Sequence, residues 1–417
     1  MNKFVLCIAT LDTKFLHVRY LKDAIEARGC RVKVADISTR GKVHFEADIT
    51  PEQILIASGL GASFHELRDM PQNAAMEVMK SGTLRLVEEF YKKEELLGII
   101  SVGGGMGTEL ACTVMKSLPI GLPKVIICSQ KVLQAGLKRY IDAKDIVPFI
   151  TLADMGGSLN FFLRDTLEKA AYTIAEMVRV TQGKQLRAPK DNLVFLTVLG
   201  TVEECAKGLE NSLTKMGYEV IRFYAGGLGT MEEMIREYGH SVRCVIELSL
   251  NEIGNFLFGG FSKALPDRLE EAGKWGIPQI VTCGNVNFVN FLEPETVSDR
   301  FKNRPTVFHN PFATLPRLNE AELMEVAKVI AQKLLGSKGP VKLVVPKGGF
   351  SVLDRRGGPL HDPVTDARFI AYLKELCQEK LPVIEIDANI NDEKFIRGVV
   401  NVFIELMGIE TKRKEVF

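Results

Sequence analysis

Apolar residues form short runs along the chain, and between the runs they recur at helical spacing. In the first half, the short runs predict strands near 4–9, 31–36, 97–102, 124–128 and 147–153. The helical spacing predicts helices near 14–28, 72–92, 109–117 and 161–181. This alternation of strand and helix predicts an α/β fold, with a mostly parallel sheet covered by helices on both faces.

The same plan starts again near residue 191. Val5–Thr13 aligns without a gap onto Leu193–Thr201, and the same offset places Gly29 over Gly217. Further strands are predicted near 243–248, 278–282, 342–345 and 382–386. The polar segment Gly183–Lys190 contains Gly and Pro and is typical of a linker. We therefore predict two similar α/β subdomains, 1–185 and 191–417.

Composition and charge are those of an ordinary globular protein. Of the 417 residues, 46% are hydrophobic and 25% charged, and 53 Lys and Arg residues nearly balance 52 Asp and Glu residues. This balance gives no electrostatic reason to expect nucleic acid or an anionic membrane as a partner. The first apolar run is broken by Asp12 and Lys14, so it predicts a strand and not a signal peptide. We expect a cytoplasmic protein.

A glycine-rich junction follows the third predicted strand. The residues that form it are Gly103, Gly104, Gly105, Met106, Gly107 and Thr108. The helix after them was assigned from Glu109, with Thr108 as its N-cap. Bare backbone at a helix N-terminus offers unpaired N–H groups to a phosphate. The junction lacks the Lys-Ser/Thr of a Walker loop and misses the dinucleotide fingerprint by one residue, so a tight turn that needs Gly only for packing is the alternative.

Ligands of such sheets bind beyond the carboxyl ends of the strands. After the first strand, Thr10 and Thr13 are candidates to contact phosphate, Lys14 to supply positive charge, and Asp12 to hold Mg²⁺. Alternatively, Asp12 and Thr13 cap the next helix. Ser129 follows the fourth strand and is a further candidate for the nucleotide site.

Three other residues of the first subdomain are candidates. Asp36 ends the second strand, where nucleotide-binding sheets often keep an acid for ribose hydroxyls, although Asp also starts turns readily. Lys144 and Asp145 precede the fifth strand and either contact the nucleotide or form an exposed ion pair of little energetic weight.

The second subdomain has its own polar candidates for a second substrate, namely Glu252, Asn287, His309 and His361. His361 is followed by Asp362, a pair that fits a general base, but no nucleophile motif accompanies it and a turn explains it as well. Arg355 and Arg356 precede two Gly residues, which is typical of a basic loop that covers an anion or of a solvated tip.

Several short motifs occur together in one order. They are Thr10–Lys14, the glycine junction, Lys144–Ile146, Pro266–Leu269, Gly276–Gln279, His309–Pro311 and His361–Pro363. Over essentially its whole length the chain resembles the Tm-one-like ATP-binding family, which is related to the N-terminal inhibitory domain of the tomato mosaic virus resistance protein. The resemblance implies two Rossmann-like subdomains, ATP with Mg²⁺ in the first of them, and a homodimer or higher homo-oligomer.

The residues and the resemblance together lead to one expected function. We expect a protein that holds Mg-ATP at Gly103–Thr108, with a reaction that the sequence leaves unresolved. The alternative is an ATP-dependent ligase or phosphotransferase acting on a small organic acid or phosphorylated metabolite between the subdomains, with Glu252, His309 and His361 as candidate catalytic residues. Phosphoryl transfer depends mainly on positioning and charge, so the lack of an obvious nucleophile does not exclude this alternative.

Overall fold

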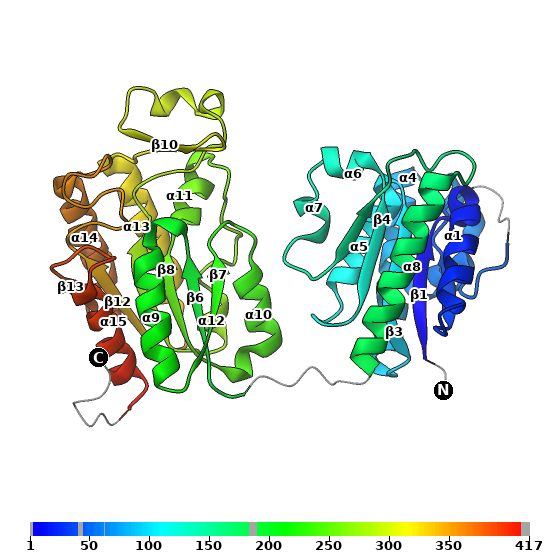
Figure 1. Cartoon of the computed structure of the whole chain (residues 1–417), viewed down its shortest axis with the longest axis horizontal. Helices are drawn as coiled ribbons and strands as arrows, with labels where there is room; N and C mark the ends of the chain where they lie inside the picture. Colours follow the sequence, from blue (N-terminus) through cyan, green and yellow to red (C-terminus); the bar gives the residue numbers. More distant parts are fainter. Residues whose placement is uncertain (1–2, 41–44, 62, 183–189, 410–417) are drawn as a thin grey trace. The chain divides into compact units, whose positions relative to one another are not determined.

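The computed structural model describes residues 3–40, 45–61, 63–182 and 190–409 (Figure 1). The chain divides into two compact units, Met1–Ala188 and Pro189–Phe417. Most of the predicted linker, residues 183–189, lies outside the described residues. Each unit is described by itself below.

The N-terminal unit is a five-stranded parallel sheet with helices between the strands. Its strands are β1 (Phe4–Ala9), β2 (Val32–Asp36), β3 (Leu96–Gly103), β4 (Lys124–Cys128) and β5 (Val147–Ile150). Its helices are α1 (Leu11–Glu26), α2 (Pro51–Ser58), α3 (Phe64–Asp69), α4 (Gln72–Lys92), α5 (Gly105–Lys116), α6 (Gln130–Gln134), α7 (Lys138–Ile141) and α8 (Phe161–Gln182). All five predicted strands are confirmed, because strands buried on both faces read as continuous apolar runs.

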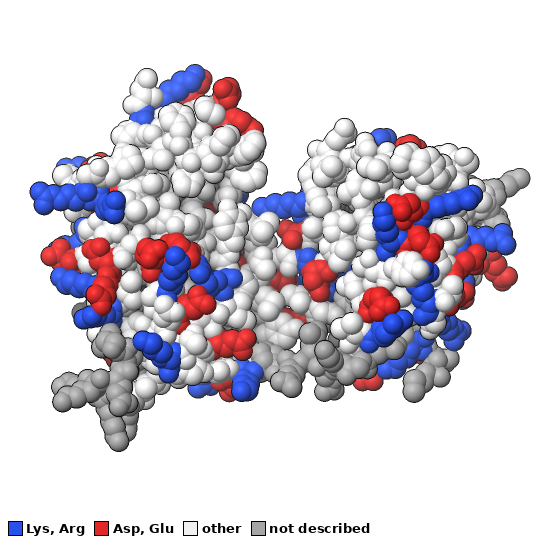
Figure 2. Space-filling view, viewed as in Figure 1, with Lys and Arg blue, Asp and Glu red and all other residues white. Residues whose placement is uncertain are grey.

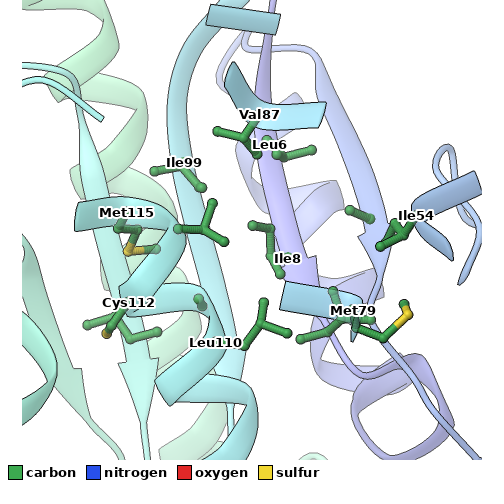
Figure 3. Close-up of a cluster of buried hydrophobic side chains, with 14 of the residues drawn as sticks. Leu6, Ile8, Ile54, Met79, Val87, Ile99, Leu110, Cys112 and Met115 are labelled. Carbon is green, nitrogen blue, oxygen red and sulfur yellow. The ribbon is translucent and has the colours of Figure 1, made fainter. Parts of the chain in front are cut away.

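Helices cover both faces of this sheet. On one face, Leu6 and Ile8 of β1 belong to a buried cluster with residues of α4 and α5, such as Met79 and Leu110 (Figure 3). On the other face, Val5 and Cys7 belong to a cluster with residues of α1 and α8. Alternate residues of one strand therefore face opposite layers, which confirms the predicted three-layer architecture.

The C-terminal unit contains a six-stranded parallel sheet and a separate antiparallel hairpin. The strands of the sheet are β6 (Leu193–Val198), β7 (Glu219–Tyr224), β8 (Val242–Ser249), β9 (Gln279–Gly284), β12 (Val341–Pro346) and β13 (Val383–Ile386), and those of the hairpin are β10 (Thr306–Asn310) and β11 (Ala313–Pro316). The helices are α9 (Glu203–Lys215), α10 (Thr230–Tyr238), α11 (Asn251–Phe258), α12 (Glu271–Lys274), α13 (Glu320–Leu335), α14 (Pro363–Cys377) and α15 (Glu393–Leu406). The sequence analysis did not predict the hairpin.

The two units share one strand order. The N-terminal sheet runs β2-β1-β3-β4-β5, and the C-terminal sheet runs β7-β6-β8-β9-β12-β13, which is the same order with one strand added. Gly29 and Gly217 each precede a second strand and have positive φ values of 80° and 90°. The repeat predicted from the sequence therefore corresponds to a shared strand order and to a shared left-handed turn, which favours Gly, before the second strand of each unit.

Surface charge is mixed in sign. On the face shown in Figure 2, Lys and Arg residues alternate with Asp and Glu residues and form no extended patch of one sign. Within the described ranges, no helix combines the length and the apolar character that a bilayer crossing requires.

Candidate functional site

The carboxyl edge of the N-terminal sheet contains a topological switch point. β1 lies between β2 and β3, so the chain leaves β1 toward one side and later returns on the other. Ile8 of β1 pairs with Ser101 of β3, which brings the loop that starts at Thr10 beside the loop that starts at Gly104. Open α/β sheets bind ligands in the crevice at such a point.

The glycine junction leaves backbone N–H groups open at this point. α5 begins at Gly105, with Gly104 as its N-cap in an extended conformation. The first bond of the helix runs from Thr108 N to Gly104 O at 2.9 Å, and the N–H groups of Gly105, Met106 and Gly107 make no hydrogen bond to any described residue. A Cβ added at Gly104, Gly105 or Gly107 would meet no atom within 4 Å. This helix start therefore has three unpaired N–H groups, at partly exposed Gly105, exposed Met106 and buried Gly107.

Thr108 departs from the prediction. It was predicted to cap the helix and to contact phosphate, but it lies in the first turn of α5 and is fully buried. Its hydroxyl donates to Gly103 O at 3.2 Å, which fastens the helix start to the end of β3. Thr108 therefore shapes the junction without reaching a ligand, whereas Met106 is 46% exposed beside the open N–H groups.

The loop after β1 brings three predicted residues to the same edge. Thr10 is the N-cap of α1, and its hydroxyl lies 3.1 Å from that of Thr13. Lys14 donates from Nζ to Met155 O at 3.1 Å, so the loop after β5 reaches back to α1. Burial lowers the pKa of Lys14, and the carboxylates of Asp154 and Asp12 oppose that shift. Lys14 is thus a half-buried cation near two acids.

Asp12 is half-buried and close to Asp36. Burial is the main cause that raises the pKa of the Asp12 carboxyl, and the negative charge of Asp36 raises that pKa further. A cation at Asp12 would relieve this repulsion. No group of three or more His, Cys, Asp or Glu residues among those described has the arrangement of a protein metal site. Mg²⁺ fits this edge only in its usual nucleotide-bound form, with one carboxylate and with phosphates and waters as its other ligands.

Asp36 has a structural position. It is fully buried, and its Oδ1 accepts hydrogen bonds from Leu11 N at 3.0 Å and from Ser38 N at 2.9 Å. These bonds join the end of β2 to the start of α1 and so position the loop that carries Asp12. Its Oδ2 has no hydrogen-bond partner among the described residues, and contact with a ribose stays a prediction.

A polar pocket of about 260 Å³ lies at the ends of β4 and β5. Its lining includes Ser129, Gln130, Gln134, Thr151 and Asp154. The Ser129 and Thr151 hydroxyls are buried and have no hydrogen-bond partner among the described residues. Because Gly103 pairs with Cys128, the pocket begins beside the glycine junction. Hydroxyl, amide and carboxylate groups of this kind can bind the hydroxyls of a sugar.

The sequence analysis missed two residues near this site. Thr151 is 2% exposed and follows β5, and His17 is 1% exposed and lies one turn after Lys14 on α1. Neither ring nitrogen of His17 has a hydrogen-bond partner among the described residues. Burial lowers the pKa of His17, and the charge of Lys14 lowers it further. The helical spacing from Lys14 to His17 was the signal that could have identified it.

Lys144 and Asp145 lie at the amino ends of the strands, opposite the carboxyl edge of the sheet. Both precede β5, and Asp145 accepts hydrogen bonds from Gly121 N and from Lys124 Nζ, each at 2.7 Å. Lys124 begins β4 and is fully buried. Lys144 donates from Nζ to Leu118 O at 3.2 Å. The prediction that Lys144 and Asp145 contact the nucleotide is therefore wrong, because they hold the amino ends of β4 and β5.

The candidates in the C-terminal unit do not share one site. Asn287 is fully buried and donates to Asp354 at 2.6 Å. His309 is exposed on β10, and exposed His361 lies 2.9 Å from Asp354 O through its Nδ1. Glu252 is 3% exposed and is bonded to Arg268. Asn287 and His361 thus meet at Asp354, whereas Glu252 is engaged by Arg268 and His309 lies on the hairpin, so the four candidates do not form one group.

Glu252 belongs to a buried charge cluster, which we define as Glu232, Glu247, Glu252 and Arg268. Arg268 donates to Glu247 at 2.6 and 2.7 Å and to Glu252 at 2.6 Å, whereas Glu232 lies 3.4 Å away. The cluster thus contains three carboxylates and one guanidinium. Burial raises the pKa of Glu232 from 4.5 to about 7, and the neighbouring Glu247 and Glu252 add to the effect of burial.

We expect Glu232→Gln to stabilise the C-terminal unit at high pH. A carboxyl whose pKa is raised by folding contributes stability below its unfolded pKa of 4.5, and this contribution is lost as the pH rises through 7. Gln resembles the protonated form, so the gain should be about 2 kcal/mol near pH 8 and close to zero near pH 4.5. Urea unfolding followed by the fluorescence of Trp275, the chain's single Trp and part of this unit, measures it. A gain that does not change with pH would contradict the assignment.

Relatives of this chain match it from end to end. A UPF0261 protein of Clostridium tetani is 34% identical over 412 residues, which cover 98% of this chain and 100% of that protein. A UPF0261 protein of Rhizobium meliloti is 28% identical over 97% of this chain and 99% of its own length. The ToMV resistance protein Tm-1 of Solanum lycopersicum is 28% identical over 96% of this chain, which spans 55% of the tomato protein.

Among solved structures, the UDP-GlcNAc 2-epimerase of Methanocaldococcus jannaschii covers 98% of this chain and 93% of its own, with 9% identity and a TM-score of 0.24. At a TM-score this low, the likeness gives no guide to function. Two family models match in sequence order. The N-terminal domain of the uncharacterised protein family UPF0261 matches residues 3–183, and the C-terminal domain of the same family matches residues 191–407. The chain therefore belongs to the UPF0261 family, which also includes relatives of the tomato Tm-1 protein.

Proposed function

We propose that this protein binds Mg-ATP at the carboxyl edge of its N-terminal sheet. The observation that carries the proposal is the start of α5, where the N–H groups of Gly105, Met106 and Gly107 are unpaired among the described residues and a side chain at Gly105 would meet no atom within 4 Å. Such N–H groups and the positive end of the helix dipole favour a phosphate. Their position at the switch point between β1 and β3 is where ligands of this fold bind.

The phosphates, the metal ion and the ribose of the nucleotide each have candidate contacts at this edge. The α5 start would hold phosphate oxygens, and Thr10, Thr13 and Lys14 would add hydroxyl groups and positive charge beside them. Asp12 would supply one carboxylate to a Mg²⁺ held mainly by the phosphates. The pocket beyond Ser129 has unpaired hydroxyls for the ribose. When bound, Mg²⁺ neutralises phosphate charge.

Binding is favoured over a ligase or phosphotransferase activity. The second activity needs polar groups that are free to converge on a second substrate. Within the C-terminal unit Glu252 is bonded to Arg268, and Asn287 and His361 both contact Asp354. A role as a nucleotide-binding protein requires only the edge described above. A homodimeric state and a cytoplasmic location accompany this proposal as expectations from the family resemblance and the composition.

Calorimetric titration of the full chain tests the proposal. We expect ATP to bind with a micromolar Kd, about −8 kcal/mol, only in the presence of Mg²⁺. AMP should bind at least about tenfold more weakly, because it lacks the phosphates that the α5 start and Mg²⁺ hold. Tight binding of NAD without binding of ATP would reverse the assignment, and the absence of heat with every nucleotide would overturn it.

A further inference from the structure

The C-terminal unit contains a larger cavity that the proposed nucleotide site does not use. It has a volume of about 700 Å³ and is formed by the loops that follow β6, β12 and β13. All three loops leave the carboxyl ends of parallel strands, where ligands of open α/β sheets bind. The volume lies within the range of small-molecule sites, roughly 300–1,000 Å³.

Two Asn side chains make this cavity a preformed one. Asn389, which is 8% exposed, donates from Nδ2 to Gly348 O at 3.0 Å and to Ser351 O at 2.9 Å. Asn391 donates from Nδ2 to Thr201 O at 3.0 Å. A Cβ at Gly348 would lie 2.7 Å from the backbone of Ala388, so the loops after β12 and β13 touch there. These contacts join the three loops before any ligand arrives.

Most acidic side chains of the lining already have partners. Glu203 forms an ion pair with Arg222, and Glu204 lies 3.2 Å from Lys207 Nζ. Asp392 accepts a hydrogen bond from Asn389 N at 2.8 Å. These three carboxylates are therefore partly neutralised by the protein itself.

Two cations of the lining are uncommitted. The side chains of Arg355 and Arg356 are exposed and form no ion pair or hydrogen bond with any residue in the described ranges. Adjacent guanidinium groups at a cavity provide planar, charge-assisted donors for an oxyanion. The carboxylate of Asp387, which also lines the cavity, has no hydrogen-bond or ion-pair partner among the described residues and would accept hydrogen bonds from hydroxyls.

We propose that this cavity binds a small polyhydroxylated anion, with its phosphate or carboxylate on Arg355 and Arg356 and its hydroxyls toward Asp387. The opposite charges fix the orientation of the molecule, since the anionic end avoids Asp387. A volume of about 700 Å³ accommodates a compound larger than a free phosphate ion. This site lies wholly within the C-terminal unit and does not depend on nucleotide binding.

Calorimetry with three probes tests this proposal. The probes are ribose 5-phosphate, gluconate and uncharged ribose, each titrated to about 10 mM so that a Kd of 1 mM would be detected. The full chain carrying Gly105→Asp is used, so that the α5 site cannot account for the heat. We expect the phosphate, the carboxylate or both to bind, and ribose to bind at least about tenfold more weakly. The stronger anionic probe identifies the terminal group.

Variants separate the site from nonspecific attraction. Arg355→Gln with Arg356→Gln should weaken the anionic probe at least about tenfold. The matched control is Arg243→Gln, which removes another exposed arginine of the same unit outside the cavity, and it should leave the affinity unchanged. Absence of heat with both anions, equal binding of ribose, or an equal loss in the control would each overturn the proposal.

Discussion

Gly105→Asp should abolish ATP binding while leaving the fold intact. A side chain at Gly105 has open space, so no steric cost is expected. The carboxylate would occupy the N–H groups at the start of α5 and repel phosphate, and we expect at least a hundredfold loss of affinity, about 2.7 kcal/mol. A negative charge in the first turn stabilises a helix by roughly 0.3–1 kcal/mol, so stability should be retained or slightly increased. Calorimetry with Mg-ATP and thermal unfolding by circular dichroism measure the two effects.

Gly105→Asn is the matched control for this variant. Asn has nearly the same size as Asp and lacks the charge, so we expect it to lose no more than about tenfold in affinity. Equal losses in both variants would assign the effect to bulk and not to charge. Unchanged affinity in Gly105→Asp would show that phosphate does not bind at this helix start.

The N-terminal fold could be predicted because its sheet is buried on both faces. Strands such as β1 and β4 then read as continuous apolar runs, and the glycine junction after β3 marks a strand-to-helix turn directly. The position of the helix start was less determined, since both Gly104 and Thr108 are acceptable N-caps. In the structure Thr108 is buried against the end of β3, so Gly104 is the N-cap. The spacing of apolar residues in the sequence does not predict the burial of a single polar side chain.

The environments of individual site residues were harder to predict, for two physical reasons. Lys144 and Asp145 precede their strand, so sequence order alone could have placed them at the amino edge of the sheet. Asp36 ends its strand as predicted, but one of its oxygens accepts hydrogen bonds from the backbone of Leu11 and Ser38. That environment depends on how the loop after β2 folds onto α1, which involves contacts between residues far apart in the sequence.

The cavity held together by Asn389 and Asn391 could not have been predicted. It needs the loops after β6, β12 and β13 to meet, and the bonds that join them link residues 41 and 190 positions apart in the sequence. Arg355 and Arg356 were identified as a possible anion loop from their type and their glycine neighbours. The structure adds the cavity beside them and the partners of the neighbouring acids.

The largest loss of stability is expected from Arg268→Met in the C-terminal unit. Arg268 is 2% exposed and is the cation that joins Glu247 and Glu252. Its removal leaves the carboxylates of the buried charge cluster without a counter-charge, and breaking a buried ion pair in this way typically costs about 3–5 kcal/mol. We expect a loss of at least about 4 kcal/mol at neutral pH in urea unfolding followed by Trp275 fluorescence. Arg268→Lys, which keeps the charge without the bidentate contact, should lose less.

The pH dependence of the loss and a compensated variant test whether unpaired carboxylates cause the loss of stability. If unpaired carboxylates cause the loss, protonation should reduce it, so the loss near pH 5 should be smaller by about 1–2 kcal/mol. Adding Glu247→Gln and Glu252→Gln to Arg268→Met should recover part of the stability, because the buried negative charge is then removed. A loss that is the same at both pH values and in the compensated variant would assign it to packing of the Arg268 side chain. The cluster would then be an incidental arrangement of charges, and the gain expected for Glu232→Gln would also be absent.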